Sequence, residues 1–126
     1  MNDSANTEKL VKDYIDAWST KDDATRKELV AKVYANNAAF YANEPGDDPV
    51  EHHGVADITA NIARVNVHLV QGKGLITEST GFAVNHGTLK VSWRMMTPDD
   101  KVAMTGMNLL LLDAAGSISQ DYIFIG

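Results

Sequence analysis

The first third of the chain carries apolar residues at the three- and four-residue spacing of amphipathic helices. One stripe runs through TEKLVKDYIDAWSTKD and a second through DDATRKELVAKVYANNA, where Asp22 or Asp23 would cap the helix start. The asparagines at 36 and 37 mark the predicted exit from the second helix. The stripe positions are Leu10, Val11, Tyr14, Ala17 and Trp18 in the first segment, and Leu29, Val30 and Val33 in the second.

A short strand, a loop and a third helix are predicted next. The aromatic run AAFYA at 38–42 indicates a strand, and the segment 43–54, rich in proline and glycine, indicates a loop. Ile58, Ile62 and Val65 then recur at helical spacing, which predicts a helix over 55–70. The valine-rich end of that segment is ambiguous between helix and strand.

After Gly74 the pattern changes to β-rich runs separated by turn-forming residues. Four strands are predicted, in LITESTGFAV, GTLKVSWRMM, VAMTGMNLLLL and SISQDYIFI, with NHG, TPDDK and DAAG between them. Two helices, a strand, a helix and four strands in this order are typical of an α+β domain with helices packed on an antiparallel meander. Without a repeat or low-complexity segment, the sequence predicts a single domain over residues 1–126.

Side-chain alternation separates the two faces of the predicted strands. In the third β-rich run, residues 101–112, both faces are apolar, although Asn108 interrupts the even-numbered one. A strand in an antiparallel sheet with one solvent-exposed face would alternate polar and apolar residues. This strand does not, so it is expected to be covered on both sides. Helices would cover one side and a second copy of the chain the other, which predicts a homodimer. The face of the preceding strand expected to meet the helices carries Leu89, Val91, Trp93 and Met95.

Composition and charge exclude several classes of function. A chain of 126 residues with 44% hydrophobic content suits one core, and its net charge of −6 with scattered Lys and Arg disfavours nucleic-acid binding. Without cysteine, and with histidines outside metal-ligand spacing, neither a thiolate site nor a bound metal is expected. Nucleotide-binding and serine-hydrolase motifs are also absent, so no cofactor is expected. No membrane segment or signal-peptide core is recognisable, which favours a cytoplasmic protein.

Four segments together resemble the nuclear transport factor 2-like superfamily, which includes ketosteroid isomerases and SnoaL-like polyketide cyclases. These segments are YIDAWSTKD, VYANNAAFYANEPG, HHGVADI and GMNLLLLDAAGSISQDYIFI, and the resemblance covers nearly the whole chain. It implies a cone in which a curved sheet wraps around a long N-terminal helix and one end opens into an apolar pocket. It also implies a dimer. The resemblance is specific for the fold and unspecific for the activity.

The resemblance also assigns candidate site residues position by position. Ketosteroid isomerases use a tyrosine on the first helix and a neutral carboxylic acid on the penultimate strand as oxyanion donors, and the matching residues are Tyr14 and Asn108. An asparagine amide donates a hydrogen bond at every pH, so Asn108 is a plausible substitute for the acid. The family's general base is an aspartate, and the matching residue is Ala42, with Asn43 or Glu44 one or two places on. The base is therefore Glu44, a residue from elsewhere, or absent.

Several further residues are candidates for the same site. His53 is a candidate acid or base at the pocket rim, oriented by Glu51 or Asp57, although adjacent loop histidines such as His52 and His53 are commonly solvated. Asp121 lies near the position of the acid/base residues of SnoaL-like cyclases. Tyr14, Trp18 and Trp93 would also suit a plain hydrophobic core. The expected substrate-pocket residues are Trp18, Phe40, Ile62, Trp93, Tyr122 and Phe124.

Three functions remain open from the sequence. The first is a cofactor-free isomerase, dehydratase or cyclase acting on an apolar carbonyl-bearing or cyclic substrate, with Tyr14 and Asn108 holding the oxyanion and His53 or Glu44 moving the proton. The second is a binding module for an apolar small molecule, in which Tyr14 and Asn108 fix the polar end. The third is a structural homodimer whose cavity is vestigial.

Overall fold

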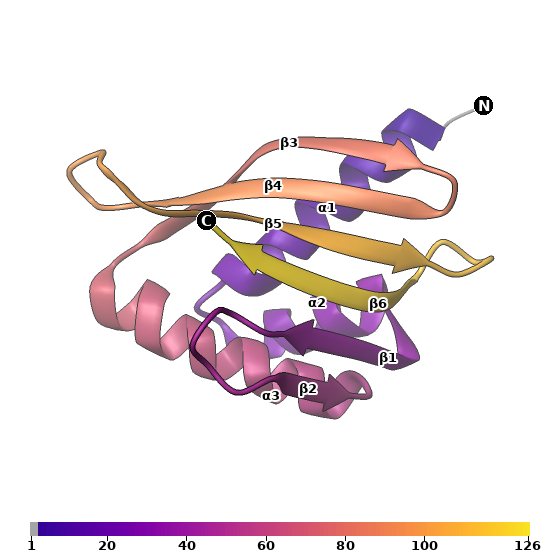
Figure 1. Ribbon diagram of the computed structural model, residues 1–126, viewed down its shortest axis with the longest axis horizontal. Helices are drawn as coiled ribbons and strands as arrows, with labels where there is room; N and C mark the ends of the chain where they lie inside the picture. The colour runs from indigo at the N-terminus through magenta and orange to yellow at the C-terminus, as the bar shows by residue number, and fades with distance from the viewer. Residues whose placement is uncertain (1–2) are drawn as a thin grey trace.

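The fold is a curved six-stranded sheet with its helices on one face (Figure 1). The computed structural model describes residues 3–126. The helices are α1 (Asp3–Ser19), α2 (Asp23–Val33), α3 (Val55–Val65) and the π-helical η1 (Asn66–Gln71). The strands are β1 (Tyr34–Ala42), β2 (Val50–His53), β3 (Ile76–Asn85), β4 (Thr88–Met96), β5 (Val102–Leu112) and β6 (Ile118–Ile125), in the spatial order β2-β1-β6-β5-β4-β3.

The sheet confirms the predicted α+β class and adds one parallel pairing. Strands β3 to β6 form the expected antiparallel meander, whereas β1 lies parallel to β6, so the sheet is mixed. The predicted loop 43–54 contains the short strand β2, which pairs with β1 in antiparallel register. None of the helices within residues 3–126 is both long and apolar enough to span a bilayer.

The second helix ends earlier than the sequence pattern predicts. Helix α2 stops at Val33, and β1 begins directly at Tyr34. Asn36 and Asn37 therefore do not mark a helix exit. They are exposed residues of β1 within the irregular stretch where the register with β6 shifts between Tyr34 and Ala39. A bulge accommodates turn-forming residues inside a strand, so the two asparagines do not indicate the end of a helix here.

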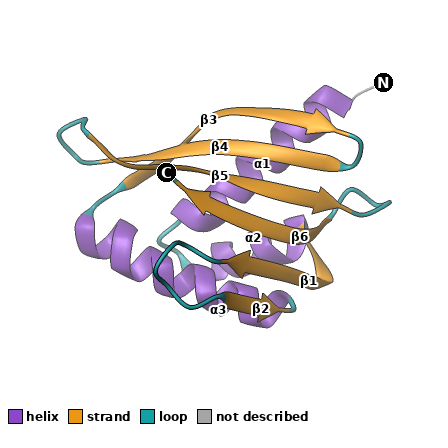
Figure 2. Cartoon of the chain, in the orientation of Figure 1, coloured by secondary structure: helices purple, strands orange, loops and turns teal. Residues whose placement is uncertain are grey.

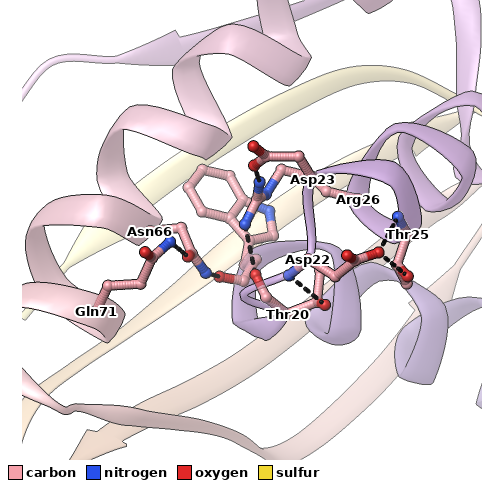
Figure 3. Close-up of polar contacts among 8 residues, drawn as sticks. Thr20, Asp22, Asp23, Thr25, Arg26, Asn66 and Gln71 are labelled. Carbon is pink, nitrogen blue, oxygen red and sulfur yellow. Dashed lines mark hydrogen bonds and ion pairs between the residues drawn. The ribbon is translucent and has the colours of Figure 1, made fainter.

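Polar contacts fix the end of α1 against α2 and η1 (Figure 3). Asp22 caps α2 by accepting a hydrogen bond from the Thr25 backbone nitrogen at 2.8 Å. The guanidinium of Arg26 is almost fully buried and donates to the Thr20 carbonyl oxygen. From the other side, Asn66 donates from Nδ2 to the Trp18 carbonyl oxygen at 2.8 Å. The last turn of α1 is thus held from two directions.

The hydrophobic core lies between the helices and the inner face of the sheet. The face predicted for β4 is confirmed, because its four inward residues are at most 8% exposed. Each fully buried aliphatic side chain of this kind contributes roughly 1.5–3 kcal/mol to stability. The core residues with no exposed surface include Val30, Ile58, Ile62, Leu89, Val91, Leu110 and Ile118.

The outer face of the sheet is apolar over β5, β6 and β1, while the helices all lie on the other side (Figure 2). Tyr41 and Tyr122 stack on this outer face with ring centroids 4.9 Å apart. Phe124 pairs in register with Met107, and its side chain is 54% exposed. Half-buried Met107, Leu109 and Leu111 continue the surface along β5. The homodimer expected from the sequence stays a prediction, and this face is where we expect it.

Replacing Phe124 with glutamate should weaken that dimer. We expect the wild-type chain to show twice its monomer mass by light scattering at micromolar concentration. We expect Phe124→Glu to raise the dimer dissociation constant by about tenfold or more, because a charge would be buried in an apolar interface. Val67→Glu is the control, since Val67 is 58% exposed but lies on η1, away from the sheet. A monomeric wild-type protein would contradict the prediction.

Candidate functional site

An apolar cavity of about 340 Å³ lies between the inner face of the sheet and α1, α3 and η1. Its floor is built from side chains that are at most 8% exposed, among them Tyr14, Phe40, Trp93 and Asn108. Exposed or half-buried residues at the end of β6, after β1 and at the end of α3 complete the lining, and we call this part of the cavity its mouth. Cavities of this size and character commonly hold small molecules.

The change from α- to π-helix at η1 shapes one wall of this cavity. Leu69 and Val70, both on η1, line the cavity. Asn66 is fully buried at the start of η1, and its Oδ1 accepts a hydrogen bond from Gln71 Nε2 at 2.9 Å. These side-chain bonds help to hold a segment with wider π-helical turns, a geometry that recurs at functional sites.

Directly behind the floor lies Asp121, whose side chain is completely buried on β6. The Tyr14 hydroxyl donates to Oδ2 of Asp121 at 2.8 Å, and the Tyr34 hydroxyl donates to the same oxygen at 2.6 Å. Asn108 donates from Nδ2 to Oδ1 of Asp121 at 2.7 Å. Three donors from α1, β1 and β5 therefore converge on one carboxyl group, which compensates for removing it from water.

Trp93 extends this network and fixes the orientation of the Asn108 amide. Its indole Nε1 donates to Oδ1 of Asn108 at 2.8 Å. Because Trp93 only donates and the ionised Asp121 only accepts, the amide must present its oxygen to one and its nitrogen to the other. Gly106 makes room for the indole, since a Cβ atom there would lie 2.4 Å from Cζ2 of Trp93.

Burial shifts the proton equilibria of the groups at the floor. Desolvation raises the pKa of Asp121 from 3.8 to about 6, although the hydrogen bonds from Asn108, Tyr34 and Tyr14 oppose the shift. Burial and the adjacent carboxylate raise the pKa of both tyrosines well above 10, so they stay neutral. Because the pKa of Asp121 is higher in the folded than in the unfolded chain, protonation of this group stabilises the folded state. This contribution to the free energy of unfolding, roughly 3 kcal/mol, is fully present below pH 3.8 and is lost as pH rises through about 6.

At neutral pH Tyr14 can offer a ligand an acceptor, and Asn108 can offer it a donor. The single hydroxyl hydrogen of Tyr14 is engaged by Asp121, so its oxygen can only accept a hydrogen bond from a ligand. Asn108 uses Oδ1 and one Nδ2 hydrogen within the network, which leaves its second Nδ2 hydrogen to donate. This differs from the two oxyanion donors expected from the sequence. Protonation of Asp121 would let the acid donate to Tyr14 and release the tyrosine hydrogen toward the cavity.

The structure brings most, but not all, of the expected pocket residues to the cavity. Tyr14, Trp18, Phe40, Trp93 and Asn108 all line it. Three expected residues lie elsewhere, and the expectation is corrected for them: Ile62 is a fully buried core residue, and Tyr122 and Phe124 lie on the outer face of the sheet.

A β-bulge explains why the sequence misplaced the residues of β6. The register between β5 and β6 shifts after Leu111, which pairs with Gln120, whereas Leu112 pairs with Ile118. The extra residue reverses the alternation, so both Ile118 and Asp121 point inward and Tyr122 points outward. If the alternation is counted from Ile118 without the bulge, Tyr122 and Phe124 are expected to point inward and Asp121 outward. The buried Asp121 was therefore found only by resemblance, and Tyr34 was hidden in a predicted helix.

The structure does not bring His53 to the cavity. Its side chain is 61% exposed, and its Nε2 lies 3.0 Å from Oε1 of Glu51. His52 lies 3.2 Å from Asp57 through Nδ1 and packs against the ring of Phe40, outside the lining. The sequence prediction of His53 as a rim acid or base is corrected accordingly, because β2 directs this side chain to the surface.

The residues at the expected position of the general base do reach the cavity. Ala42 and Glu44 both belong to its lining. Oε1 of Glu44 accepts a hydrogen bond from the Ile125 backbone nitrogen at 3.1 Å, which directs the carboxylate toward the end of β6. Among residues 3–126, no group of three acidic or histidine side chains is arranged to hold a metal ion.

The structure is similar to solved proteins of the nuclear transport factor 2-like fold. An isomerase candidate of the SnoaL-like family from Agrobacterium tumefaciens has a TM-score of 0.79 and 22% identity, with 94% of this chain and 95% of that chain covered. A protein with a cystatin-like fold from Methylobium petroleophilum has a TM-score of 0.72 and 20% identity, covering 97% and 76%. An NTF2-like protein from Mesorhizobium loti has a TM-score of 0.70 and 15% identity, covering 98% and 93%.

These likenesses confirm the predicted fold. No family model matches the sequence, and no curated protein matches it. At these levels of identity the shared fold does not determine an activity, so the function must be argued from the cavity itself.

Proposed function

We propose that the protein binds an apolar small molecule in the cavity, with a polar group of that molecule resting on Tyr14 and Asn108. The observation that carries the proposal is the buried carboxylate of Asp121, which holds both side chains from behind. Both residues line an otherwise mostly apolar cavity, and each keeps one hydrogen-bonding function that the network does not use. A hydroxyl group fits this floor best, because it can donate to the Tyr14 oxygen and accept from Asn108.

The energetics favour a ligand with such a group over a purely apolar one. An apolar molecule would displace water from the floor and leave the polar atoms of Tyr14 and Asn108 without partners, which costs about 1–3 kcal/mol. A hydroxyl would restore those bonds while the rest of the molecule gains from burial against Phe40 and Trp93. Preorganisation adds to this, since the network already fixes the two side chains before binding.

Binding of 2-naphthol and 2-methylnaphthalene to the wild type and Tyr14→Phe tests the proposal. The probes have similar size, but only 2-naphthol has a hydroxyl. We expect Tyr14→Phe to weaken 2-naphthol binding by about five- to tenfold, because one hydrogen bond is lost. Binding of 2-methylnaphthalene should change little. Affinities are measured by fluorescence titration at pH 7.5.

Tyr122→Phe is the matched control, since it removes a hydroxyl that lies outside the cavity lining and donates to Gln120. It should leave the affinity for both probes unchanged. If the wild type binds neither probe, the cavity is not a ligand site of this kind. If Tyr14→Phe weakens both probes equally, the hydroxyl does not contact the floor.

A second candidate function is cofactor-free proton-transfer catalysis of the isomerase, dehydratase or cyclase type. The observation that favours it is the bond between Tyr14 and Asp121, a carboxyl group whose pKa is raised to about 6. Asp121 does not line the cavity, so it would act through Tyr14. A proton from the substrate would pass to the Tyr14 oxygen while the Tyr14 hydrogen passes to the carboxylate, which balances both transfers.

Isomerisation of 3-cyclohexenone to its conjugated isomer tests this second candidate. We expect the rate to rise with pH through about 6, because only ionised Asp121 can accept the proton. Asp121→Asn should lower the rate by about a hundredfold or more, as expected for loss of a general base. Asp47→Asn, in the exposed loop after β1, is the control. A pH-independent rate, or equal rates in wild type and Asp121→Asn, would contradict catalysis by this route.

A further inference from the structure

Arg64 is the cationic side chain in the lining of the cavity. It lies near the end of α3 and is exposed, whereas Tyr14 and Asn108 at the floor are 2% exposed. Arg64 therefore belongs to the exposed part of the lining, at the mouth, whereas the hydrogen-bonding floor is buried. Within the described part of the chain, no carboxylate forms an ion pair with Arg64.

The Arg64 side chain is nevertheless held in place. Its Nη2 donates to Oδ1 of Asn61, a residue one turn earlier on α3 that is 5% exposed and also lines the cavity. A guanidinium has five N–H donors, so this bond leaves most of them available. Because Asn61 is neutral, it orients the charge of Arg64 without neutralising it.

Among residues 3–126, Glu44 is the one carboxylate in the cavity lining, and it is engaged differently. It is half-buried and accepts a hydrogen bond from the Ile125 backbone nitrogen at 3.1 Å. No ion pair joins it to Arg64, so the two side chains do not cancel each other at contact distance. The mouth therefore has one cation with spare donors and one anion already bonded to the chain, an arrangement that favours an incoming anion over an incoming cation.

Occupation of the cavity would strengthen this preference. A ligand filling the mouth would displace water around Arg64 and lower the local dielectric constant. A neutral ligand would remove hydration from the guanidinium without compensation. A ligand with a carboxylate would replace the lost water with charge-assisted hydrogen bonds, which the planar guanidinium forms well.

We propose that the natural ligand is an amphiphilic organic anion, with an apolar body in the cavity and a carboxylate bound by Arg64 at the mouth. This inference rests on the proposed binding function and specifies the chemical class of the ligand. The chain as a whole carries a net charge of −6, so the preference for an anion is local to Arg64 and not a property of the overall charge.

Binding of 2-naphthylacetate and its neutral amide, 2-naphthylacetamide, tests the inference. We expect the wild type to bind the carboxylate about tenfold more tightly than the amide at low ionic strength, and this preference should fall as salt is added. Arg64→Gln should abolish the preference while leaving the affinity for the amide within about twofold. Arg64→Lys should keep part of the preference, because it keeps the charge but loses the planar fork.

Lys90→Gln is the control, since it changes the net charge equally at an exposed position of β4 outside the cavity lining. It should keep the full preference for the carboxylate. Equal binding of the two probes by the wild type, or an unchanged preference in Arg64→Gln, would overturn the inference and leave the proposed binding function standing. If neither these probes nor 2-naphthol bind, the proposed function itself fails.

Discussion

The buried carboxylate of Asp121 is the interaction on which the rest of the site depends. It accepts hydrogen bonds from Tyr14, Tyr34 and Asn108, and so joins α1, β1 and β5 to β6 at one point. An ionised carboxyl group survives in such a place only when its oxygens are well bonded. The same bonds determine which atoms of Tyr14 and Asn108 remain for a ligand, so the chemistry of the cavity floor follows from a residue that the ligand does not touch.

The cavity and the network support each other physically. An apolar cavity provides little polar competition for the hydrogen bonds of Asp121, which keeps Tyr14 and Asn108 in fixed orientations. In return, these orientations provide the floor with a donor and an acceptor in otherwise apolar surroundings. The wall of η1 and the anchored end of α1 border this space, because Asn66 donates to the carbonyl oxygen of Trp18 and Arg26 donates to that of Thr20. Under the proposed function, the fold supplies a preformed cavity in which a few polar contacts would determine which ligand binds.

The sequence predicted the fold class from the order of its elements, and it predicted the inward face of β4 because apolar and polar residues alternate regularly there. Asn108 was assigned to the pocket by the family resemblance, whereas Tyr14 also lies on a clear helical stripe. The sequence misplaced Tyr122 because a bulge reverses the alternation in β6, and local propensity does not reveal a bulge. Tyr34 was hidden because a helix pattern runs directly into β1. Strand β2 was not predicted, because the proline and glycine residues around it indicate a loop. Its strand conformation depends on pairing with β1, which a local sequence pattern cannot show.

The most direct test of this account is the titration of the Asp121 carboxyl carbon by nuclear magnetic resonance in the wild-type protein. The account predicts an apparent pKa of about 6, because burial outweighs three hydrogen bonds that favour the ionised form. It also predicts that the hydroxyl protons of Tyr14 and Tyr34 shift in the same pH range, since both donate to this group. Titration of Asp121 near 3.8, with no change at the two tyrosines, would contradict a buried carboxylate at the centre of the site.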